Sequence, residues 1–335
     1  MIMRMISRLT LTLVGLLLLA QTVTACELCA ISSAGSARGE STAGFLFTLS
    51  EQFVSYHTEQ FEGEEFKRVG GSDPDWYDKS ITHLIPTYNF SERVGVSLNV
   101  PIISEQFQRF YLRYNAAGLP LPPETERGRE SGLGDTALIG RVTVFNKAEM
   151  EWGFGVNVLA GVKFPTGNTD RLTAEADEAR AHGHRAVSGV HQSDLALGSG
   201  SYDGIFGLTV NSRWQRLFCN VLAQYYLRTE GESTYTYSDE VMVSGGPGAY
   251  LLLDKRYTLS LQANAGYESR GRDTLFGVPS NDTGMTGWYM GPQIGFTWGL
   301  HFSATVAVDL PLVIYNNGFQ NVPDYRIHGG LTWRF

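Results

Sequence analysis

The stretch that decides the fold lies at the carboxy terminus, where Tyr325 to Phe335 reads Y-R-I-H-G-G-L-T-W-R-F. Large apolar residues alternate in it with polar ones, and the two sets are Tyr325, Ile327, Leu331, Trp333 and Phe335 against Arg326, His328, Thr332 and Arg334. Because successive side chains of a strand point to opposite faces, the pattern predicts a two-faced strand. A soluble sheet would bury the apolar face, whereas a membrane barrel turns it toward lipid and the polar face toward the lumen.

The same alternation recurs along the chain and decides between these two interpretations. It predicts strands at residues 44–55, 77–90, 93–103, 132–146, 151–164, 202–214, 217–228, 240–253, 257–268, 287–298, 300–310 and 325–335. This is a set of about twelve strands, and bacterial single-chain barrels have an even number. Short turns and long loops follow each other in strict alternation, which matches the short periplasmic turns and long outer loops of such barrels. The sequence therefore predicts an all-β fold, a transmembrane antiparallel barrel over residues 44–335.

The composition agrees with a barrel and excludes one class of partner. Among the 335 residues are 38 Gly, 16 Tyr and 18 Phe, and many of the aromatic residues fall near strand ends, where interfacial belts lie. The formal net charge is -8. A nucleic-acid partner would require a basic surface, so none is expected.

Residues 1–25 have the three-part pattern of a secretory signal peptide. Arg4 and Arg8 precede an apolar run over residues 9–20, and small residues end the segment at Ala25. The apolar run is shorter than the roughly 20 residues of a spanning helix. Together with the barrel pattern, this leader predicts export to the outer membrane of a Gram-negative bacterium.

Residues 26–43 are expected to form a periplasmic segment that begins with a C-x-x-C pair, Cys26 and Cys29. Several roles stay open for the two cysteines: a disulfide, a redox pair, half of a metal site, or lipid attachment at Cys26 after cleavage. A second C-x-x-C pair, which would favour zinc, does not follow. The segment is also the place where a periplasmic partner would bind.

The polar face of the predicted strands is expected to line the lumen. The residues expected to line a pore are Arg93, Arg141, Asn157, Lys163, Arg213, Asn220, Gln224, Gln262, Asn264, Gln293, His301, Asp309, Arg326 and His328. A barrel of about twelve strands lies between barrels that side chains fill and porins with an open channel. A narrow polar pore and a hydrogen-bonded interior without conduction are therefore both open.

Three glycine-rich motifs border the long loops. They read S-G-L-G-D at residues 131–135, F-P-T-G at 164–167 and L-G-S-G-S-Y-D at 197–203. Their order resembles that of the outer-membrane family named after the meta pathway of phenol degradation. The resemblance implies a transporter barrel for small, often aromatic, compounds. From the residues themselves we expect an architectural role, in which Asp135 and Asp203 accept hydrogen bonds from loop amides and the glycines tolerate positive φ.

The longest loop, residues 165–201, carries a histidine pattern. His182, His184 and His191 follow the acidic residues Glu175, Asp177 and Glu178. Imidazole and carboxylate groups bind transition metals, so these histidines are a candidate metal site. Solvated histidines in an exposed loop are the alternative.

The sequence gives no sign of an enzyme, and we expect no catalytic residues and no cofactor. Outer-membrane lipases resemble the chain in size and strand number, but they would require a Ser beside a His on the lipid-facing wall. His301 and His328 are instead predicted on the lumen face. Two hypotheses follow: a channel for small solutes, which can include aromatic compounds, or a structural barrel without conduction. A metal-related role through the histidine loop and the C-x-x-C pair is a further alternative.

Overall fold

The structure is a computed structural model that describes residues 43–67, 74–111, 124–182 and 188–335. The predicted signal peptide and the segment with Cys26 and Cys29 lie outside the described residues.

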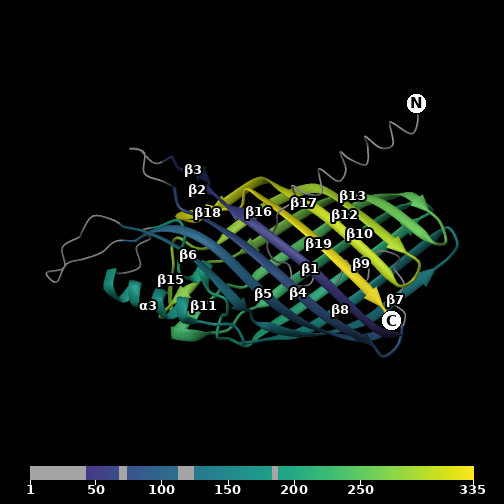
Figure 1. Ribbon diagram of the computed structural model, residues 1–335, viewed down its shortest axis with the longest axis horizontal. Coiled ribbons are helices and arrows are strands. Elements are labelled where there is room, and N and C mark those ends of the chain that lie inside the picture. Colours follow the sequence, from purple (N-terminus) through teal and green to yellow (C-terminus); the bar gives the residue numbers. More distant parts are fainter. Residues whose placement is uncertain (1–42, 68–73, 112–123, 183–187) are drawn as a thin grey trace.

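The core of the molecule is a closed antiparallel barrel of 12 long strands (Figure 1). They are β1 (Gly44–Tyr56), β4 (Trp76–Asn89), β5 (Val94–Tyr111), β7 (Thr136–Ala148), β8 (Trp152–Phe164), β9 (Asp203–Trp214), β10 (Leu217–Leu227), β12 (Glu240–Leu253), β13 (Tyr257–Arg270), β16 (Met285–Trp298), β17 (Phe302–Asn316) and β19 (Tyr325–Arg334). β1 and β19 close the barrel in a register from Leu46 opposite Arg334 to Ser55 opposite Tyr325. The predicted fold class is confirmed.

The two faces of the wall differ as the alternation predicts. On β10, Val221 and Tyr225 are exposed, whereas Leu222 and Gln224 between them are buried. On β8, Phe154 and Val158 are exposed in the same way. The outer surface of the barrel is therefore apolar, and closure pairs every strand edge, which allows a sheet to lie in lipid. In the described part of the chain, no helix has the length and apolar character that a membrane crossing requires.

The sheet continues beyond the barrel at the end that carries the long loops. The short elements there are β2 (Thr58–Phe61), β3 (Glu64–Glu65), β6 (Glu124–Leu133), β11 (Tyr235–Thr236), β14 (Thr274–Leu275), β15 (Val278–Pro279), β18 (Phe319–Val322) and the 3-10 helices η1 (Ser193–Leu195) and η2 (Glu232–Thr234). β5 pairs first with β7 and then, from Ile102 to Tyr111, with β6.

Three predictions of strand limits were therefore wrong. The region 104–131, predicted as a loop, contains the end of β5 and most of β6. The strand predicted at 132–146 begins only at Thr136, since Gly132 and Leu133 belong to β6. β17 runs on to Asn316, inside the loop predicted at 311–323. In the first and third cases, the strand continues past the length that a bilayer requires.

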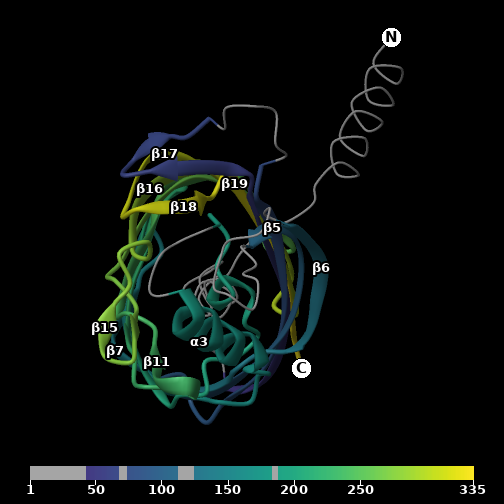
Figure 2. The same cartoon turned by 90° about the vertical axis from the view of Figure 1, so that its left-hand side faces the viewer.

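The longest loop folds into the mouth of the barrel. It contains the helix α3 (Asp170–His182), which lies inside the ring of strands in the end view (Figure 2). Val190 and Leu195 of the same loop are fully buried and form a cluster with residues that include Tyr77 and Phe107 of the wall. This apolar contact makes the loop part of the interior.

Candidate functional site

Most of the side chains predicted to line a pore occupy inward positions of the wall. Lys163, Gln224, Gln262 and Asn264 are buried, and those of intermediate burial are Arg141, Asn157, Arg213, Asn220, Gln293, Asp309, Arg326 and His328. Arg93 and His301 are exposed, because they lie in short turns just before β5 and β17 begin.

Many of these inward side chains are bound to each other. Asn264 Nδ2 donates to Asp309 Oδ1 over 2.9 Å, and His328 Nε2 lies 3.4 Å from Asp309 Oδ2. Gln293 Nε2 donates to Gln262 Oε1 over 3.2 Å. These bonds satisfy polar groups that would otherwise be buried without partners.

A second chain of bonds crosses the opposite part of the wall. Arg141 donates to Thr143 Oγ1 over 2.8 Å, and Thr143 Oγ1 donates to Asn157 Oδ1 over 2.7 Å. Asn157 Nδ2 then donates to Thr209 Oγ1 over 2.8 Å. The inner wall is thus built from connected polar groups rather than from isolated charges.

The three glycine-rich motifs meet in one network at the base of the inward loop. Asp135 Oδ1 accepts a bond from Gly167 N over 3.0 Å, and its Oδ2 accepts one from Ser199 N over 2.8 Å. Lys163 Nζ lies 2.8 Å from Asp135 Oδ2 and 2.7 Å from Asp203 Oδ2. Asp203 also accepts a bond from Thr229 N over 3.0 Å. The expectation that both aspartates bind loop amides is confirmed.

Two glycines of these motifs touch directly. A Cβ atom on Gly167 would lie 2.5 Å from the carbonyl oxygen of Leu197, and one on Gly198 would lie 2.6 Å from the backbone of Gly167. Both contacts are with backbone, which cannot move aside. The motif residues therefore fix the two ends of the long loop against each other.

Below the inward loop, the lumen contains a cavity of about 260 Å³, the loop-side cavity. Tyr56 and Tyr77 stack at its edge with ring centroids 4.1 Å apart. Lys79 lies 2.6 Å from Glu105 and donates to the carbonyl oxygen of Asp194, a loop residue, over 3.0 Å.

Arg270 also lines the loop-side cavity, and among the described residues it forms no ion pair within 4.0 Å. The sequence analysis did not single out Lys79, Glu105 or Arg270 as lining residues. Glu105 and Arg270 lie just beyond the predicted ends of their strands, and only a continuing alternation marks them as inward.

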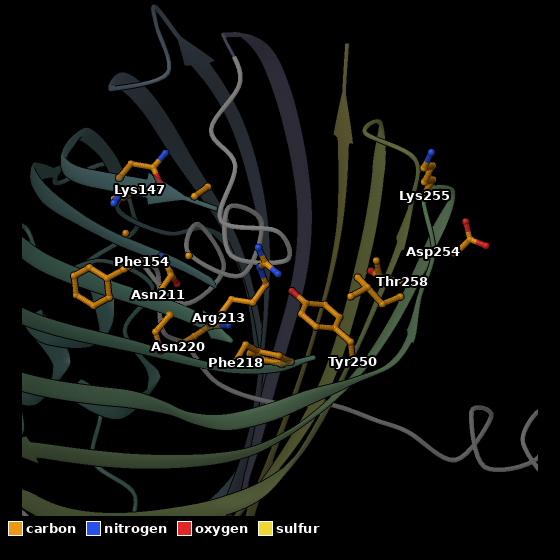
Figure 3. A pocket seen from close by; sticks show the side chains of 16 residues that line it. Lys147, Phe154, Asn211, Arg213, Phe218, Asn220, Tyr250, Asp254, Lys255 and Thr258 are labelled. Atoms are coloured by element: carbon orange, nitrogen blue, oxygen red, sulfur yellow. The ribbon is translucent and has the colours of Figure 1, made fainter. Parts of the chain in front are cut away.

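A second cavity of about 390 Å³, the turn-side cavity, lies at the end of the barrel with the short turns (Figure 3). Its lining includes Asn211, Arg213 and Asn220, of which Arg213 and Asn220 were predicted to line a pore. Phe218 and Tyr250 line it too. The sequence analysis did not single out these two aromatic residues.

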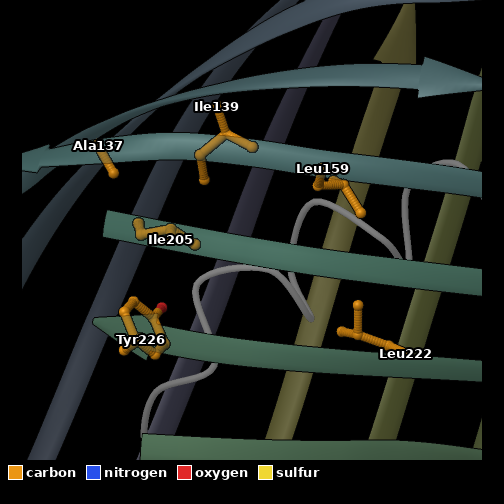
Figure 4. Close-up of a cluster of buried hydrophobic side chains, with 6 residues drawn as sticks. All are labelled: Ala137, Ile139, Leu159, Ile205, Leu222 and Tyr226. Atoms are coloured by element: carbon orange, nitrogen blue, oxygen red, sulfur yellow. The ribbon is translucent and has the colours of Figure 1, made fainter. Parts of the chain in front are cut away.

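The inner face of β10 connects the two cavities. Tyr226 lines the loop-side cavity, Phe218 and Asn220 line the turn-side cavity, and Leu222 and Gln224 lie between them. Leu222 and Tyr226 belong to a buried apolar cluster that crosses the inner wall from β7 to β10 (Figure 4). The other members are Ala137, Ile139, Leu159 and Ile205.

His191 is the one described member of the predicted metal site whose surroundings are defined. Its Nδ1 lies 3.9 Å from Glu175 Oε1 and its Nε2 lies 4.0 Å from Asp282 Oδ2. Burial lowers the pKa of His191, but the carboxylates of Glu175, Asp282 and Asp194 raise it more, to about 10. His191 therefore carries a positive charge at neutral pH and joins the inward loop to the segment before β16.

The metal hypothesis stays a prediction. His184 lies outside the described residues, and His182 ends α3. Within the residues that the structure describes, no group of three or more His, Cys, Asp or Glu residues is placed to hold a metal ion.

Comparison with a solved outer membrane channel supports the fold. The structure of an outer membrane channel from Pseudomonas putida F1 is similar, with a TM-score of 0.57 and 12% identity over 88% of this chain and 96% of that one. The β domain of the Bordetella autotransporter BrkA has a TM-score of 0.43 and 10% identity, over 87% of this chain and 99% of that one. The transport unit of the autotransporter AIDA-I from Escherichia coli has a TM-score of 0.40 and 8% identity, over 92% of this chain and 97% of that one.

No protein-family model matches the sequence, and no curated protein matches it. The chain is an outer-membrane β-barrel by its fold, as predicted.

Proposed function

We propose that this chain is an outer-membrane channel that passes small solutes. The observation that carries the proposal is the pair of cavities inside the closed barrel, about 260 Å³ under the inward loop and about 390 Å³ at the opposite end. A barrel that serves only as a scaffold has no need for cavities at both ends of its lumen.

The inward loop is the element that limits solute size. Leu195 and Val190 anchor it in the wall, and α3 stands in the mouth, so a solute must pass beside a fixed obstacle. The inner face of β10 then presents polar and apolar side chains in turn. This surface suits solutes with both a polar group and an apolar part, in agreement with the aromatic compounds that the family resemblance implies. We propose membership of that family on the same grounds.

Planar-bilayer recording of the purified full-length protein tests the proposal. Discrete conductance steps are expected, and their absence at every applied voltage would refute it. Gly155 lines the turn-side cavity, and a Cβ atom there would meet nothing closer than 3.8 Å. A Gly155→Phe variant is therefore expected to fold and to conduct less.

Gly140 provides the matched control, because it lies exposed in β7 and its Cβ atom would come no closer than 3.6 Å to another residue. A Gly140→Phe variant places the same ring on the lipid side and is expected to conduct as the unmodified protein does. Equal conductance of the two variants would show that current does not pass the turn-side cavity.

A further inference from the structure

The turn-side cavity has a floor that three adjacent strands build from small and amide side chains. In the strand registers, Gly155 of β8 lies opposite Asn211 of β9, and Asn211 lies opposite Asn220 of β10. Gly155 leaves space, since the nearest atom to an added Cβ would be 3.8 Å away. The two asparagines supply amide groups, each of which donates and accepts hydrogen bonds. The floor is thus open above β8 and polar above β9 and β10.

Arg213 gives the cavity a fixed positive charge. Its Nη2 donates to the carbonyl oxygen of Glu149 over 2.9 Å and its Nη1 to that of Gln215 over 3.4 Å. These carbonyls hold the guanidinium in place without neutralising it. A guanidinium has five N–H groups, so donors remain for a ligand. Among the described residues, no carboxylate lies within ion-pair distance of Arg213.

An aromatic pair lies beside Arg213, since Phe218 of β10 is its register partner on the neighbouring strand. The rings of Phe218 and Tyr250 have centroids 5.0 Å apart and are tilted by 47°. The Phe218 ring lies against Gly248 of β12, where a Cβ atom would come within 2.3 Å of it, so only glycine allows this position. In the close view, Arg213, Phe218 and Tyr250 surround the same space (Figure 3). The cavity therefore combines a cation with an apolar ring surface.

We propose that the turn-side cavity binds a small organic anion with a planar apolar part, of which an aromatic monocarboxylate is the simplest example. The carboxylate accepts hydrogen bonds from Arg213, the amides of Asn211 and Asn220 bind its remaining lone pairs, and the ring lies beside Phe218. A volume of about 390 Å³ is in the range of small-ligand sites. The inference rests on the proposed channel, because it places a solute site inside that lumen.

Isothermal titration calorimetry on the full-length protein in detergent tests the site with three probes: benzoate, benzyl alcohol and acetate. Benzoate is expected to bind with one site per chain and at least about tenfold more tightly than either other probe, because only benzoate has both the charge and the ring. Arg213→Gln is expected to weaken benzoate binding by about tenfold or more. Phe218→Leu is expected to weaken benzoate binding and to leave that of acetate unchanged.

Arg216 provides the matched control, since it lies in the turn that follows β9, with an exposed side chain outside the cavity. Arg216→Gln is expected to bind benzoate as the unmodified protein does. Each variant is first checked for the shift in gel mobility on boiling that a folded barrel shows. Equal affinity of Arg213→Gln and Arg216→Gln, or equal affinity for benzoate and benzyl alcohol, would overturn the proposal.

The two proposals fail separately. Conductance without benzoate binding would remove the anion site and leave the channel. Benzoate binding without conductance would keep the site and remove the channel.

Discussion

Lys163 Nζ lies 2.8 Å from Asp135 Oδ2, and this ion pair joins the barrel wall to the base of the inward loop. Lys163 is the second-last residue of β8 and Asp135 precedes β7, so the pair also links neighbouring strands where they leave the regular ladder. Both side chains are almost fully buried, as is Asp203, which lies 2.7 Å from the same ammonium group. Lys163 therefore compensates Asp135 by itself and shares the compensation of Asp203 with Arg228, whose Nη1 lies 3.1 Å from Asp203 Oδ2.

Removal of this lysine is predicted to cost more than removal of either carboxylate. Lys163→Met leaves Asp135 without a cation and Asp203 with Arg228 alone, and should lower stability by about 3–5 kcal/mol, the usual effect of breaking a buried ion pair. Asp135→Asn leaves Lys163 paired with Asp203 and should cost less. The temperature at which the folded gel band disappears measures the difference. A larger effect of Asp135→Asn would contradict the proposed balance of charges.

The apolar anchor of the loop is predicted to control the size of the open channel. Leu195 is fully buried against the wall, so Leu195→Ala should weaken loop docking by about 2–5 kcal/mol. Larger or more frequent conductance steps should follow. Leu208→Ala on the exposed outer face is the control and should leave single-channel recordings unchanged.

Loop docking should also depend on pH through His191. Its folded pKa of about 10 exceeds the usual unfolded value of about 6.5, so its contribution to stability is complete below the lower value and is lost as pH rises through the higher one. The frequency of high-conductance openings should therefore increase between pH 7 and pH 10.5. His191→Gln should remove most of this increase while other titrating groups remain. An equally steep response in that variant would exclude His191 as its source.

Because the two loop ends are in contact, replacing Gly198 by alanine is predicted to lower stability much more than replacing Gly155 by alanine. Gly198→Ala forces a Cβ atom to within 2.6 Å of the Gly167 backbone and should cost about 1–3 kcal/mol, as overpacking does. Gly155→Ala, in open space, should change stability little. The melting temperatures of the two variants, monitored by gel mobility, give the comparison. Equal melting temperatures would show that the loop ends adjust without cost.

The barrel could be predicted from the sequence because lipid and lumen impose opposite demands on alternate residues. The strand at Glu240–Leu253 was predicted with its observed limits, because the alternation begins after a polar loop and stops at a turn. Outside the bilayer, that constraint disappears. α3 is polar on most sides and has no strong pattern, and its position depends on contacts such as Arg171 with Glu130, at 2.5 Å, that sequence spacing does not reveal.

The candidate site was predictable only in part. Arg213 and Asn220 were found from alternation, whereas Phe218, which shares the face of Asn220, was not singled out because only polar residues were considered as lining a pore. Its inward position requires Gly248 on the neighbouring strand, and such a pairing depends on register. Arg270 was missed because its strand runs past the predicted end.

The seam between β1 and β19 sets the order of events in biogenesis. Thr48 and Thr332 share a buried 2.9 Å hydrogen bond across a separation of 284 positions. β1 can therefore complete its pairing only after the last strand, β19, is present. Contacts between such distant segments form slowly, because ordering the intervening polypeptide costs much entropy. Until synthesis and export of the final strand are complete, β1 has a bare edge that invites aggregation, and the nascent protein depends on being kept apart from its neighbours.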